Sequence, residues 1–160
     1  RGFPASLQHS IMALAERAGP GMDGQGDITA VFTVLVAGSD MEEPVADILR
    51  GVLDGHVVLD RRIAERGRFP AIDLLRSVSR SLPAAASEAE NALIARTRSL
   101  LSAWDRAEMM VQAGLYQKGS DPMVDQAIKL WPNLDAFLAE DAPDNGIAGS
   151  FARLTQCLGG

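Results

Sequence analysis

Residues 87–113, SEAENALIARTRSLLSAWDRAEMMVQA, carry the clearest helical periodicity in this chain of 160 residues. Ser87 and Glu90 form the Ser-x-x-Glu capping box that begins a helix, and Gly114 is placed to end it. The stretch therefore predicts one helix of roughly 40 Å, at a rise of about 1.5 Å per residue. Its apolar face has steps of four and three residues and consists of Leu93, Thr97, Leu100, Trp104, Ala107 and Val111.

The residues after this helix are also patterned as helices. Asp121-Pro122 is a helix start, and apolar spacing continues from there to Trp131. Pro132 is expected to break this helix before a short third helix at residues 134–138. Residues 141–146 are predicted to be a linker, and residues 147–158 a small tail helix. Residues 83–160 are thus predicted to form an all-α domain.

Residues 1–82 instead alternate helix and strand, which indicates an α/β fold. Residues 28–36, ITAVFTVLV, are apolar almost throughout, as expected of a strand buried on both faces of a parallel sheet. Helices are expected over residues 7–18 and after Asp40, and short strands at residues 56–59 and 71–73. So few strands do not make a self-sufficient parallel sheet. Because the first residue is Arg1 rather than Met, we expect the chain to be a piece of a longer protein.

Composition excludes some classes of function. The net charge of −6 disfavours nucleic acid as the main partner, although residues 61–80 hold six arginines against two acids. No apolar run reaches the length of a membrane span. The single cysteine, Cys157, permits no internal disulfide, so a reducing, cytoplasmic setting fits best.

Several apparent motifs fail on their context. Residues 19–24 match G-x-G-x-x-G, but they follow a predicted helix and precede a strand, the reverse of a dinucleotide site. The sequence of residues 114–119 is close to that of a phosphate-binding loop, but Ser120 stands where the lysine of such a loop should be. His9 and His56 lack partners at metal-ligand spacing, so no metal site is predicted. We expect Cys157 to be an inert thiol.

Five blocks, in order, resemble one known family. They are GDITAVFTVLV (26–36), MEEPVAD (41–47), LDGHVVLDRR (53–62), IAERGRFPAID (63–73) and SVSR (77–80). They are similar to the rotary-type ATPases related to the catalytic subunit of ATP synthase, in the branch that powers type III protein export. GSDPMVDQAIKLWP (119–132) resembles the flagellar members, and the resemblance extends to about residue 139.

The resemblance implies a fold and an activity. Residues 1–82 would be the C-terminal part of a RecA-like P-loop NTPase domain with a parallel sheet, and residues 83–160 its C-terminal helical domain. The phosphate-binding loop and the ligands of Mg²⁺ would lie upstream of Arg1. The full-length enzyme would be a cytoplasmic homohexamer at the base of the flagellar export apparatus that hydrolyses ATP. The fragment alone would be inactive.

The resemblance also implies roles for individual residues. Arg80 matches the arginine finger that reaches the γ-phosphate bound by the neighbouring subunit. Phe69 matches an aromatic residue that packs against adenine, where tyrosine is usual, and Phe137 falls near a second one. Composition alone leaves Arg80 as an ordinary surface arginine, and both phenylalanines as core residues. Lys118 and Asp121 lie in the turn that would face a coiled-coil stalk protein, although a plain helix connection has the same pattern.

The implied partners extend beyond the stalk. They are a stator-like regulator, the export gate and chaperone–substrate complexes, with peripheral membrane contact through the upstream region. The alternatives are an ATPase of a virulence type III secretion system, a non-catalytic paralogue that completes a neighbour's site, and an interaction module that docks a stalk or chaperone without nucleotide.

Overall fold

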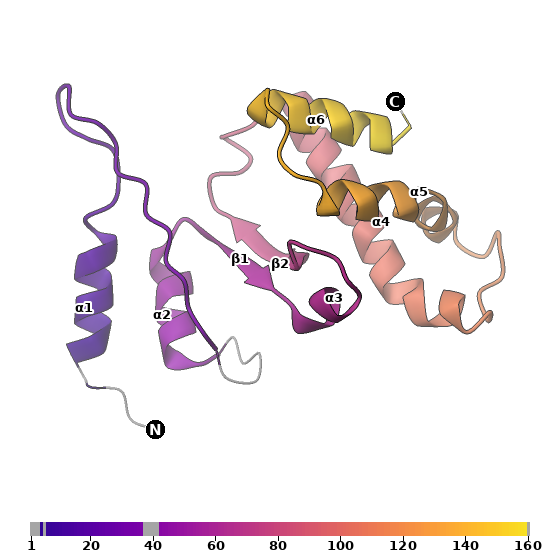
Figure 1. The fold of residues 1–160 in the computed structure, drawn as a ribbon, viewed down its shortest axis with the longest axis horizontal. Helices are drawn as coiled ribbons and strands as arrows, with labels where there is room; N and C mark the ends of the chain where they lie inside the picture. The colour runs from indigo at the N-terminus through magenta and orange to yellow at the C-terminus, as the bar shows by residue number, and fades with distance from the viewer. Residues whose placement is uncertain (1–3, 5, 37–41, 160) are drawn as a thin grey trace. The chain divides into compact units, whose positions relative to one another are not determined.

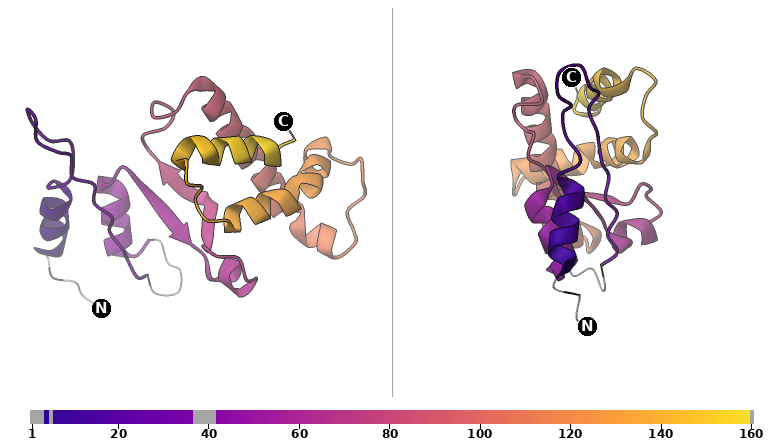
Figure 2. Two further views of the ribbon diagram at one scale, coloured as in Figure 1. Left: turned by 45° about the horizontal axis from the view of Figure 1, so that its top comes forward. Right: turned by 90° about the vertical axis from the view of Figure 1, so that its left-hand side faces the viewer.

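A computed structural model describes residues 4, 6–36 and 42–159 of the chain. It contains two compact units, Arg1–His56 and Val57–Gly160. Figures 1 and 2 show the elements of each unit. None of the described helices combines the length and the apolar character that crossing a membrane requires.

The first unit contains the two packed helices α1 (Ser6–Ala15) and α2 (Pro44–Val52). Proline is favoured at the start of a helix because the first N–H groups lack partners within the helix, and Pro44 occupies that position. Ala46 and Leu49 are the buried side chains of α2. Asp40, which was expected to precede this helix, lies outside the described residues.

The segment at residues 28–36 differs from its prediction. It forms no strand among the described residues, and its one bridge joins Ile28 to Gly19. Val31 and Leu35 are 90% and 93% exposed. The prediction of a strand buried on both faces is therefore wrong here, because a strand exists only where neighbouring backbone pairs with it. Apolar β-branched residues favour the strand conformation, but they do not supply the neighbouring strand with which to pair.

The two paired strands are β1 (Gly55–Leu59) and β2 (Ile72–Ser79), which run in opposite directions (Figure 1). They are joined by α3 (Arg61–Glu65), whose first turn is capped by the side chain of Asp60. The Asp60 N–H donates to the carbonyl of Ala71 at 2.9 Å, just beyond the strands. β2 is longer than the predicted strand at residues 71–73 and extends to the residue before Arg80.

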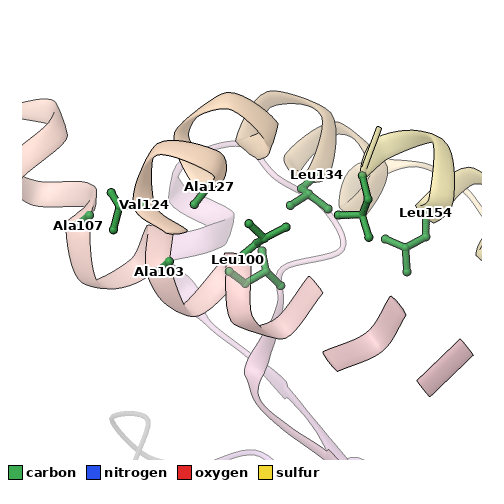
Figure 3. Packing of buried hydrophobic residues seen from close by; sticks show 9 residues of the cluster. Leu100, Ala103, Ala107, Val124, Ala127, Leu134 and Leu154 are labelled. Atoms are coloured by element: carbon green, nitrogen blue, oxygen red, sulfur yellow. The ribbon is translucent and has the colours of Figure 1, made fainter. Parts of the chain in front are cut away.

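The rest of the second unit consists of α4 (Glu88–Gln112), α5 (Pro122–Ala139) and α6 (Gly146–Cys157). The predicted capping box of α4 is confirmed, because Ser87 and Glu90 bind each other's backbone N–H groups. Figure 3 shows the core between these helices, in which Leu100 and Leu134 are each 1% exposed. The other labelled side chains are mostly small, which lets the helices approach closely: Ala103, Ala107, Val124, Ala127 and Leu154.

Helix α5 continues through Pro132, so the prediction of a break and a separate third helix is wrong. Proline lacks the N–H that would bind the carbonyl four residues earlier, and this loss ordinarily favours a break. Packing of the residues on either side of Pro132 outweighs the loss of this hydrogen bond. Trp131 stacks on Trp104 of α4 with ring centroids 4.7 Å apart, and Leu134 is buried in the core. Tertiary burial thus overrides a local helix breaker.

Replacing Pro132 by alanine is therefore expected to stabilise the chain. The helix regains a donor, which outweighs the freedom that alanine adds to the unfolded chain, for a net gain of about 1–2 kcal/mol. Urea unfolding followed by circular dichroism measures this gain. Pro122→Ala, at the first helical position, is the matched control and should bring no gain. A less stable Pro132→Ala chain would contradict the explanation.

Candidate functional site

Arg80 is exposed and follows directly on the last residue of β2. The end of this strand is held against β1, because the Val58 N–H donates to the hydroxyl of Ser77 at 3.0 Å. A paired strand thereby fixes the backbone from which the exposed Arg80 side chain extends. A guanidinium group can donate two parallel hydrogen bonds to phosphate or carboxylate oxygens.

The other arginines of the basic stretch make ion pairs. Asp60 is the centre of one group: Arg62 lies 3.2 Å from its carboxylate and Arg76 lies 3.4 Å away. The hydrogen bond from the Arg62 side chain is the main cause that lowers the pKa of Asp60. Asp60 therefore stays ionised and keeps both its ion pairs and its cap on α3. Arg61 pairs with Glu65 at the surface.

The connection between β1 and β2 is tied to both long helices. Arg66 Nη1 lies 2.6 Å from Glu108 Oε1 of α4, and Arg68 Nε lies 3.3 Å from Asp135 Oδ1 of α5. The Arg68 side chain is 12% exposed and also donates to the carbonyl of Ile72. These contacts position the residues around Phe69. A pocket of about 130 Å³ lies beside these ion pairs, and Arg68, Glu108 and Trp104 are among the residues that line it.

The structure places the two candidate aromatic residues differently. Phe69 follows Arg68 and is 63% exposed, so its ring has a face available for stacking. Phe137 is half-buried in α5 and packs against the helical core. Asp135 is two residues before Phe137, so the Arg68–Asp135 ion pair joins the segments that carry the two rings. Phe69 is thus accessible to a planar ligand, whereas Phe137 also contributes to packing.

The turn between α4 and α5 is held by Tyr116, Asp121 and Asp125. Asp121 Oδ1 accepts the N–H groups of Met123 and Val124 at the start of α5. The Tyr116 hydroxyl lies 3.0 Å from Asp125 Oδ1, and burial first, then this hydrogen bond, raises its pKa. Lys118 is exposed on this turn, whereas Asp121 is half-buried as a helix cap.

Cys157, at the end of α6, is a half-buried free thiol. Burial raises its pKa, which keeps it protonated and agrees with the expected inert thiol.

Sequence reasoning missed the residues that hold this region together. Arg66 and Glu108 are 42 positions apart, and Arg68 and Asp135 are 67 apart, so no local spacing relates them. The surplus of arginines at residues 61–80 was the one available signal, and it indicated that these residues need acidic partners elsewhere.

The chain was compared with known proteins. Residues 1–79 match the nucleotide-binding domain of the ATP synthase alpha/beta family, and residues 86–153 match the C-terminal domain of type III secretion ATPases such as EscN. The chain therefore belongs to the ATP synthase alpha/beta family, in the branch of the type III export ATPases, whose C-terminal part it resembles. The observed fold, a small sheet followed by helices, agrees with the C-terminal part of such an ATPase.

Individual relatives support the branch. A flagellum-specific ATP synthase of Salmonella typhimurium is 49% identical over 140 residues, covering 88% of this chain and 31% of the relative. The SPI-2 type 3 secretion system ATPase of the same organism is 43% identical over 138 residues, covering 86% and 31%. The assembled ATPase EscN of enteropathogenic E. coli is structurally similar, with a TM-score of 0.89 at 34% identity, covering 99% of this chain and 38% of EscN. The chain thus spans about a third of these relatives.

Proposed function

We propose that the full-length protein is a Mg²⁺-dependent, homohexameric ATPase that energises flagellar type III protein export from the cytoplasm. The observation that carries this proposal is an exposed Arg80 at the end of a paired strand, in a chain of this family. Between the two relatives from Salmonella typhimurium, the flagellar one is 49% identical and the SPI-2 one 43%, which supports the flagellar branch over virulence secretion. The two matched ranges leave residues 80–85 between them, which supports a domain boundary after residue 82.

Arg80 is proposed to act in the nucleotide site of the neighbouring subunit. When water attacks the γ-phosphorus and the bond to ADP breaks, negative charge spreads over the γ-phosphoryl oxygens. The Arg80 guanidinium donates hydrogen bonds to these oxygens and stabilises that charge. Mg²⁺, when bound, neutralises charge on the β- and γ-phosphates. The resemblance assigns its ligands to residues upstream of Arg1, so the 160-residue chain alone is expected to hydrolyse no ATP.

Phe69 is proposed to stack on the adenine ring. Phe69 is 63% exposed and its segment is held by the Arg68–Asp135 ion pair, so a planar base can reach a positioned aromatic side chain. Phe137 is proposed as a second aromatic of this pocket. Because it packs against the helical core, its substitution also disturbs folding.

We expect Phe69→Ala to weaken nucleotide binding by about tenfold, since stacking of a base on an aromatic ring contributes about 1–3 kcal/mol. Titration of the full-length enzyme with a fluorescent ATP analogue measures the affinity. Phe69→Tyr keeps the stacking face and should bind like the wild type. Unchanged affinity in Phe69→Ala would remove Phe69 from the pocket, and the same titration of Phe137→Ala, read beside its thermal stability, tests the second ring.

The helical turn at residues 114–121 is proposed to contact a coiled-coil stalk protein. One solved relative is EscN in complex with its central stalk EscO, with a TM-score of 0.82 at 34% identity. Lys118 is the exposed charge on the turn, whereas Asp121 also caps α5. Lys118 is therefore the cleaner position for charge reversal in a test of stalk-stimulated ATPase activity. A stator-like regulator, the export gate and chaperone–substrate complexes are the further proposed partners.

A further inference from the structure

β2 is irregular in the residues shortly before Arg80. Asp73 Oδ1 accepts the backbone N–H groups of Leu75 and Arg76 at 3.0 and 3.1 Å, which folds these residues into a turn within the strand. The Ser77 hydroxyl closes this turn by donating to the carbonyl of Asp73. Some backbone N–H groups of the strand are thus bound by a side chain rather than by a neighbouring strand.

The carbonyls of the same turn are bound by Arg98 of α4. Its Nη1 donates to the carbonyl of Leu74 at 2.8 Å and to that of Ser77 at 3.4 Å, and its Nη2 donates to that of Leu75 at 3.0 Å. Successive carbonyls of a regular strand point in opposite directions, so Leu74 and Leu75 can share one guanidinium only because the strand turns here. Arg98 therefore binds three carbonyls of the irregular part of β2.

Arg98 stands on a rigid support. Its neighbour Thr97 is 7% exposed, and Leu100, two residues further along α4, is 1% exposed in the helical core. The long Arg98 side chain thus connects the core of the helical domain to the strand end. Ser77 is only three residues before Arg80, at about 3.3 Å per residue of strand. A displacement of the turn would move the start of Arg80 with it.

We propose that Arg98 is a positioning residue that sets the placement of Arg80 for catalysis. The proposal rests on the proposed role of Arg80 as the arginine finger. Catalysis depends on groups held within a fraction of an ångström, and a displacement of about 1 Å can slow a reaction by about a hundredfold. Arg98 touches no reacting atom in this role and acts through the backbone of β2.

The first test is the kinetics of the full-length hexameric ATPase. In Arg98→Ala, kcat is expected to fall by about tenfold to a hundredfold, while the KM for ATP and hexamer formation stay unchanged. Arg98→Lys should recover part of kcat, because an ammonium keeps the charge but cannot span three carbonyls as a planar guanidinium does. Arg106→Ala is the matched control, since Arg106 lies on the same helix, bonds to Ser102 and should leave kcat unchanged.

The second test is a double-mutant cycle with Arg80→Ala. If Arg98 acts through Arg80, then Arg80→Ala/Arg98→Ala is no slower than Arg80→Ala alone. A normal kcat in Arg98→Ala, or an equal further loss in the double variant, would overturn the positioning role while leaving the finger intact. Normal turnover in Arg80→Ala would instead overturn the finger assignment itself. Loss of hexamers in both Arg98→Ala and Arg98→Gln would assign Arg98 to assembly and also overturn the proposal.

Discussion

Arg80→Ala is expected to lower ATP turnover of the full-length hexamer by about 10³-fold or more. In its proposed role as arginine finger, Arg80 stabilises charge that develops only in the transition state, so ATP binding should stay close to that of the wild type. Steady-state ATPase assays and titration with a fluorescent nucleotide separate the two effects. Arg80→Lys should rescue little, because a single ammonium does not reproduce bidentate hydrogen bonding.

The control is Arg61→Ala, which removes another exposed arginine of the same stretch, one that pairs only with nearby Glu65 among the contacts described above. It should leave turnover unchanged. If Arg80 serves the neighbouring subunit as proposed, mixing Arg80→Ala subunits with subunits whose phosphate-binding loop is disabled should restore part of the activity. Near-normal turnover of assembled Arg80→Ala hexamers, or a mixture that stays inactive, would count against an arginine finger acting between subunits.

Leu100→Ala is expected to lower the free energy of unfolding of the chain by about 3–5 kcal/mol. Leu100 is 1% exposed at the centre of the contact between α4, α5 and α6, so truncation leaves a cavity that the neighbouring side chains cannot fill (Figure 3). Urea unfolding followed by circular dichroism gives this difference from the shift in midpoint at constant slope.

Met109→Ala is the matched control for the core. Met109 lies on the same helix but is 82% exposed, so its truncation should change stability by less than about 0.5 kcal/mol. A loss of under about 1 kcal/mol in Leu100→Ala would mean that the helices rearrange to fill the space, and the packing described above would then be wrong.

Where a local signal was sufficient, sequence and structure agree. The capping box of Ser87 and Glu90 begins α4, and Asp121 caps α5. The resemblance of the ordered blocks identified the family that the comparisons show. The placements of Phe69, Phe137 and Arg80 are described by the structure, whereas their functional roles stay predictions.

Where the outcome depended on distant residues, the sequence was insufficient. The apolar composition of residues 28–36 does not show whether a neighbouring strand pairs with them. The sequence around Pro132 likewise does not show that Trp104 stacks on Trp131, the residue before this proline. Helix caps, helical periodicity and the family resemblance were determined by the sequence alone, because they depend on residues within a few positions of each other or on short contiguous segments of sequence. The continuity of α5, the ion pairs around Phe69 and the Arg98 contacts before Arg80 were decided only by the tertiary structure, because each requires groups that are brought together by folding.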